Sequence, residues 1–79
     1  MTGGESSDPR PGDTIILART DGRFDVLYIN DDGDRDAIRL GLDDTHRAYI
    51  VAVRCLEQSG GVTVWFCHQA RPDELQRYG

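Results

Sequence analysis

Four aspartates and one asparagine crowd into the stretch Asn30-Asp31-Asp32-Gly33-Asp34-Arg35-Asp36, which invites comparison with a calcium-binding loop. Such a loop has glycine at its sixth position and carboxylates at its first and twelfth. With Gly33 as the sixth residue, those two positions hold Tyr28 and Arg39, so the pattern fails at both ends. We expect a solvated hairpin turn here, and the sequence leaves weak binding of a divalent ion open.

The residue types that bind zinc are few and badly spaced: His46, Cys55, Cys67 and His68 show neither a C-x-x-C nor an H-x-x-x-H pattern. Cys67 and His68 are neighbours on a predicted strand and point to opposite faces. A nucleophile pair of Cys67 with His46 or with His68 would need an approach in space that the sequence does not show. Gly60-Gly61 precedes a predicted strand, whereas a phosphate-binding loop runs from a strand into a helix. We therefore expect no metal, no cofactor, no catalytic residue and no enzyme.

The overall charge narrows the classes of partner. Nine arginines and no lysine face fourteen acidic residues in a chain of 79 residues, which gives a net charge of −5. An acidic protein is not expected to bind duplex nucleic acid or an anionic membrane.

No stretch approaches the ~20 consecutive apolar residues that cross a bilayer. The first residues also lack the basic and then apolar order of a secretion signal, so a cytoplasmic location is expected.

The elements that must position any site follow the order β-β-β-α-β in one domain over residues 13–79, after a Gly- and Pro-rich tail at 1–12 that is expected to be disordered. Asp43 or Asp44 can cap the helix, and Gly60 can end it. Pro72, followed by acidic residues, predicts a short C-terminal helix. The fold class is α+β, with one helix on one face of a four-stranded, mainly antiparallel sheet. Apolar and β-branched runs place its strands at 14–19, 24–29, 37–42 and 62–67.

One helix covers only one face of such a sheet, so the other face needs a different cover. Alternation along the last strand sends Trp65 to that uncovered face, together with Arg39, and Phe24 and Tyr28 or else Leu27 and Ile29 join it there. The side chains expected to face the helix are Ile38, Leu40, Leu42, Val62, Val64 and Phe66. The candidate binding residues are Trp65, Tyr28, Phe24, Arg39 and Ile50, the last an apolar residue on the polar arc of the helix.

Three covers remain open for the apolar patch: the terminal helix through Leu75 and Tyr78, a second copy of the chain, or a ligand, nucleic acid or other protein. A second copy is favoured because twofold pairs are the commonest soluble assemblies and small domains often need association for stability. The sequence thus predicts a small, non-enzymatic, cytoplasmic interaction module that forms a homodimer. The alternative is a binder of single-stranded nucleic acid or of a small ligand on an open aromatic face.

The layout also resembles that of small, uncharacterised bacterial domains of similar length. The resemblance is carried by Asp43-Asp44-Thr45 at the start of the helix, Gly60-Gly61 before the last strand and Tyr78-Gly79 at the end. It covers most of residues 14–79 and concerns the order of the elements. The resemblance implies a fold and a bacterial origin. Because such domains carry no established catalytic residues, it says nothing about activity.

Overall fold

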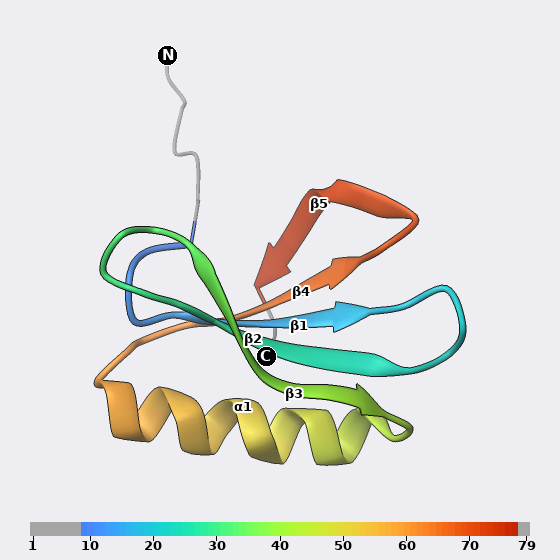
Figure 1. The fold of residues 1–79 in the computed structure, drawn as a ribbon, viewed down its shortest axis with the longest axis horizontal. Helices are drawn as coiled ribbons and strands as arrows, with labels where there is room; N and C mark the ends of the chain where they lie inside the picture. The colour runs from blue at the N-terminus through green and yellow to red at the C-terminus, as the bar shows by residue number, and fades with distance from the viewer. Residues whose placement is uncertain (1–8, 78–79) are drawn as a thin grey trace.

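The computed structural model describes residues 9–77, apart from the side chains of residues 72–74. In this part of the chain one helix packs against one face of a five-stranded sheet, which makes two layers (Figure 1). In chain order the elements are β1 (Thr14–Ala18), β2 (Phe24–Ile29), β3 (Arg35–Leu42), α1 (Thr45–Ser59), β4 (Val64–His68) and β5 (Arg71–Arg77).

The sheet is mixed, with the strand order β3-β2-β1-β4-β5. The pairs β1–β2, β2–β3 and β4–β5 are antiparallel, while the central pair β1–β4 is parallel. The predicted α+β class is confirmed. The sheet has five strands and not the predicted four, and its central pair is parallel while the other pairs are antiparallel. The tail expected at 1–12 falls largely on residues 1–8, outside the described residues.

The predicted C-terminal helix is also wrong, because residues 71–77 form β5. This strand pairs with β4, so that Leu75 lies opposite Cys67 and Arg77 lies opposite Trp65. Without β5, one side of β4 would expose unpaired backbone N–H and C=O groups at the edge of the sheet. A tight turn after His68 brings the chain back to satisfy these groups, and this long-range gain outweighs the local helical signal of Pro72 and its acidic neighbours.

The helix begins and ends where the sequence predicts. The carboxylate of Asp44 accepts a hydrogen bond from the His46 amide at 3.1 Å, and Gly60 takes the left-handed conformation at φ 73° that ends the helix. The small side chains of Ala48 and Ala52 are fully buried, which lets α1 lie close to β1 and β2. No helix in the described part of the chain is long and apolar enough to cross a membrane.

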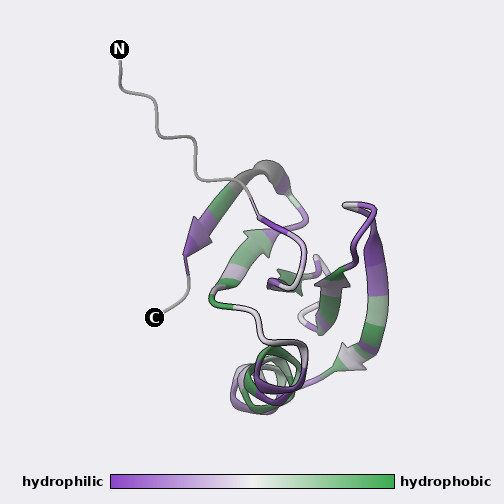
Figure 2. Ribbon diagram, turned by 90° about the vertical axis from the view of Figure 1, so that its left-hand side faces the viewer, coloured by the Kyte–Doolittle hydropathy of each residue, from purple (hydrophilic) through white to green (hydrophobic). Residues whose placement is uncertain are grey.

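Each face of the sheet carries its own apolar cluster. The helix-side face holds Ile16, Val26 and Val64 against Ala48 and Ala52, with Phe24, Leu42, Val51, Leu56 and Phe66 around them. The reverse face, opposite α1, holds Ile15, Ile29, Trp65 and Cys67, with Leu17, Leu27 and Leu75 around them. In a view nearly along α1, β5 and the beginning of β3 lie away from the helix (Figure 2). Residues 9–13, the segment before β1, lie between these two edge strands on the reverse face.

Three side chains expected to face the helix are exposed instead. Ile38 is 41% exposed and Leu40 is 61% exposed on β3, and Val62 lies before β4 with 85% of its surface exposed. The register of β3 against β2 shifts twice between Ala37 and Leu42, so the strict alternation behind the expectation does not hold there. Only Leu42 of this strand reaches the helix-side cluster.

Candidate functional site

The predicted aromatic cluster is not assembled on one face. The sheet register puts Trp65 opposite Ile15 on the reverse face, while Phe24 pairs with Ala18 and Tyr28 pairs with Thr14 on the helix-side face. Leu27 and Ile29 accompany Trp65, which is the second arrangement that alternation allowed. Phe24 and Tyr28 therefore cannot form a stacking platform with Trp65, and the expectation that they share its face is wrong.

Trp65 is buried within the single chain, with 4% of its surface exposed. Its indole Nε1 donates a hydrogen bond to Oδ2 of Asp13 at 3.1 Å. The guanidinium carbon of Arg77 lies 5.9 Å from the centre of its ring, within the range of a cation–π contact. The expectation that Trp65 lies on an uncovered platform is therefore wrong, because Asp13 and Arg77 of the same chain contact its ring.

The Asp13 carboxylate fastens that segment, and the sequence analysis did not single it out. Besides the indole of Trp65, it accepts hydrogen bonds from the amides of Arg10 at 3.1 Å and Thr63 at 3.3 Å. Burial would raise the pKa of Asp13, but the hydrogen bonds from Arg10, Trp65, Thr63 and Val62 outweigh it and hold the pKa below its ordinary value of 3.8. An aspartate directly before a strand has no spacing pattern that signals such a long-range role.

Arg39 and Ile50 both lie on the surface, far from the Trp65 ring in the layout of the fold. Arg39 is exposed and pairs with Val26, a residue of the helix-side cluster, between the two register shifts of β3. Its expected place on the face of Trp65 is therefore wrong. Ile50 is 40% exposed on α1, on the side turned away from the buried Ala48 and Ala52.

The acidic turn is held together by an asparagine. Oδ1 of Asn30 accepts the amide hydrogens of Asp32 at 2.9 Å and Asp34 at 3.0 Å, while its side-chain amide donates to the Asp36 carboxylate at 3.3 Å. Gly33 completes the turn with φ 83°, a conformation that favours glycine. No group of three or more metal-ligating side chains gathers among the described residues. The turn therefore has an internal source of order that needs no cation.

Cys67 and His68 point to opposite faces, as alternation predicts. Cys67 is buried in the reverse-face cluster, and its thiol lies 3.6 Å from the carbonyl oxygen of His68 and 3.9 Å from that of Arg71. The His68 ring is exposed and meets Phe66 edge-on at 5.2 Å. A hollow of about 320 Å³ beside it is lined by His68, Ala70 and Arg71. The buried thiol packs among the apolar side chains of the reverse-face cluster, as a small apolar group does.

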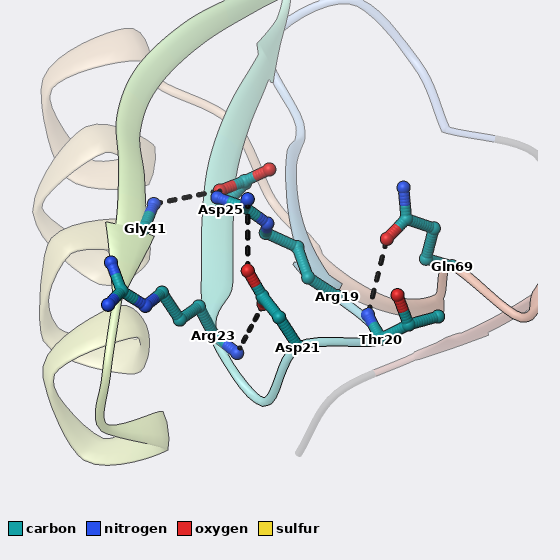
Figure 3. Close-up of polar contacts among 7 residues, drawn as sticks. All are labelled: Arg19, Thr20, Asp21, Arg23, Asp25, Gly41 and Gln69. Atoms are coloured by element: carbon teal, nitrogen blue, oxygen red, sulfur yellow. Dashed lines mark hydrogen bonds and ion pairs between the residues drawn. The ribbon is translucent and has the colours of Figure 1, made fainter.

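A polar network at the other end of β3 explains why Leu40 points outward. Asp25 accepts a hydrogen bond from the Gly41 amide at 2.8 Å and forms an ion pair with Arg19 at 3.5 Å (Figure 3). Arg19 also pairs with Asp21 at 3.1 Å. Gly41 has φ 72°, so the backbone turns at this point and the residue before it leaves the pattern of alternation. A glycine inside a predicted strand is the one sequence signal that could have indicated this bulge.

The same network joins two turns. The amide of Thr20 donates to Oε1 of Gln69 at 3.2 Å, which links the β1–β2 turn to the β4–β5 turn (Figure 3). Asp21 accepts the amide hydrogen of Arg23 at 3.0 Å and so closes the β1–β2 turn itself. These hydrogen bonds and ion pairs thus support the strands and turns next to the exposed part of β3.

No protein-family model, no curated protein and no solved structure matches the chain.

Proposed function

We propose that this protein is a small, non-enzymatic interaction module that forms a homodimer, with β3 in the contact between the copies. The observation that carries the proposal is the exposure of Leu40 and Ile38, at 61% and 41%, on a strand at the edge of the sheet. Full burial of an exposed Leu or Ile side chain contributes roughly 1.5–3 kcal/mol. About half of that gain remains for a second copy here, because both side chains are already partly covered. A second copy that covers both therefore gains a useful part of a dimer's binding free energy.

The surroundings of these two residues also favour an ordered contact. The backbone of β3 is supported by β2 on one side, and the Asp25–Gly41 hydrogen bond fixes the bulge that presents Leu40. A rigid surface loses little conformational entropy when it binds. Two features of β3 oppose the open-ended pairing of strands that would build a fibre: its register shifts and its charged residues Arg35, Asp36 and Arg39. A closed pair of copies is therefore favoured.

The absence of enzyme activity belongs to the same proposal. Asp13, the titratable side chain with a shifted pKa, is engaged by four hydrogen bonds from its own chain. The buried Cys67 thiol lies on the reverse face, away from the His68 ring. These placements support a role in recognition, because the Cys67 thiol and the His68 ring lie on opposite faces of the sheet.

The test is the mass of the native chain across a dilution series, measured by light scattering or sedimentation equilibrium. The expected mass is near twice 8.8 kDa, falling toward one chain on dilution. Leu40→Asp is expected to shift the equilibrium to the monomer. Val62→Asp is the matched control, since Val62 is also an exposed apolar residue but precedes β4, which β2 and β1 separate from β3. A single-chain mass at the highest concentration reached would contradict the proposal.

A further inference from the structure

The outer surface of α1 is basic in an acidic protein. Arg47, Ile50 and Arg54 follow one another at spacings of three and four residues, so they lie along one side of the helix. All three are exposed, and neither arginine forms an ion pair with a described residue, including Glu57 one turn further on. This stripe thus combines one apolar side chain with two positive charges that no described residue neutralises.

The stretch from the acidic turn into β3 has the opposite character. Asp31, Asp32, Asp34 and Asp36 are exposed and outnumber the exposed Arg35 and Arg39 of the same stretch, which also holds the exposed apolar residues of β3. None of these four carboxylates forms an ion pair with a described residue. Both ribbon views place this turn away from the outer surface of α1 (Figures 1 and 2). The two surfaces are complementary, yet they do not meet within one chain.

We infer that α1 of one copy docks on the acidic turn and β3 of a second copy, with Arg47 and Arg54 facing the turn and Ile50 facing Ile38 and Leu40. The inference rests on the proposed homodimer and identifies its second surface. Two such contacts exchanged about a twofold axis give a closed dimer. Charge complementarity speeds association and sets the orientation, while the apolar contacts slow dissociation.

This arrangement also fits the shape of the edge. A sheet continued from β3 to β3 of another copy would have to accommodate two register shifts. Side chains of a helix that pack on the exposed residues of β3 need no regular backbone ladder. Because the charges lie at the surface, the dimer is expected to weaken as the salt concentration rises.

The experiment uses two charge-reversed variants of the full chain. The helix variant carries Arg47→Glu and Arg54→Glu, and the turn variant carries Asp31→Arg and Asp32→Arg. Each changes only side chains that form no hydrogen bond or ion pair with the described residues, so each is expected to fold, with circular dichroism as the check. Arg10→Glu, on the segment before β1, tests the effect of net charge away from the contact. It lowers the net charge by two, whereas the helix variant lowers it by four and the turn variant raises it by four.

Each variant alone is expected to raise the dimer dissociation constant at least about tenfold, because like charges then face each other in both contacts. An equimolar mixture is expected to regain a dimer of native mass that contains one chain of each kind. A native-like dimer in either variant alone, or a mixture that stays monomeric, would overturn the helix-to-turn contact while leaving the homodimer itself standing. A native chain that is monomeric throughout would remove the proposed function and this contact together.

Discussion

The indole nitrogen of Trp65 and the carboxylate of Asp13 lie 3.1 Å apart, across 52 positions of the sequence. This hydrogen bond joins the segment before β1 to β4 on the reverse face of the sheet. It also changes the meaning of the chain's single tryptophan. Trp65 therefore reports on the integrity of the fold, and the surface that we propose for a partner lies elsewhere, on β3 and α1.

Replacement of Asp13 is expected to loosen this arrangement. Asp13→Ala removes an acceptor shared by the indole of Trp65 and the amides of Arg10 and Thr63, and leaves these donors without their partner. The expected loss in the free energy of unfolding is about 2 kcal/mol. Urea unfolding followed by Trp65 fluorescence measures it. Asp21→Ala, which changes an exposed carboxylate in a turn, is the control and is expected to cost less.

Lowering the pH is expected to remove the contribution of Asp13 to the free energy of unfolding. The pKa of Asp13 in the folded protein lies below the ordinary value of 3.8, so the ionised form is bound more favourably in the fold than in the unfolded chain. Its stabilisation is fully present above 3.8 and is lost as the pH falls through the folded-state pKa.

The measurement compares the native chain with Asp13→Asn from neutral pH downward. The difference in their free energies of unfolding is expected to shrink below 3.8. A difference that stays constant or grows in acid would mean that Asp13 is not held in its ionised form. Other carboxylates titrate equally in both chains, so the difference isolates this one group.

Two neighbouring glycines are expected to respond very differently to alanine. A Cβ at Gly61 would collide with the backbone carbonyl of Gly12, while a Cβ at Gly60 meets nothing within 4 Å. Gly60→Ala therefore costs only the strain of a left-handed residue, roughly 1–2 kcal/mol. Gly61→Ala must displace the segment before β1 and is expected to cost more. Thermal unfolding of the two variants makes the comparison, and equal losses would show that Gly12 does not lie against Gly61.

Trp65 is expected to be shielded from solvent and from large ligands. Acrylamide should quench its fluorescence weakly in the folded chain and strongly after unfolding, because 4% of its surface is exposed. Addition of a single-stranded oligonucleotide at low salt is expected to leave the emission unchanged. Quenching that disappears as salt is added would instead favour the alternative function, the binding of single-stranded nucleic acid.

The elements that depend on local signals were predictable from the sequence. Alternation along β4 separates Trp65 and Cys67 from Val64 and Phe66 correctly, and the ends of α1 follow from Asp44 and Gly60. These features involve neighbouring residues only. The exposed place of Ile50 also follows from the helical repeat.

The features that depend on distant partners were not predictable in the same way. Residues 71–77 form a strand because β4 offers an edge, and no local pattern shows that edge. Trp65 is contacted by Asp13 at its indole nitrogen and by Arg77 at its ring, two residues from opposite ends of the domain sequence. Leu40 is exposed because Asp25 holds the Gly41 amide across the sheet. In each case a long-range contact outweighs a local preference.

The parallel pairing of β1 with β4 has a consequence for how the chain reaches its folded state. Thr14 and its neighbour Val64 lie 50 positions apart in the sequence, so this central pairing closes one of the longest loops in the fold. A nascent chain that ends before β4 has only the three strands β1, β2 and β3, and the side of β1 that later pairs with β4 has no partner strand. Acquisition of structure is therefore expected to be slow for so small a molecule, and to finish only when its last quarter is present.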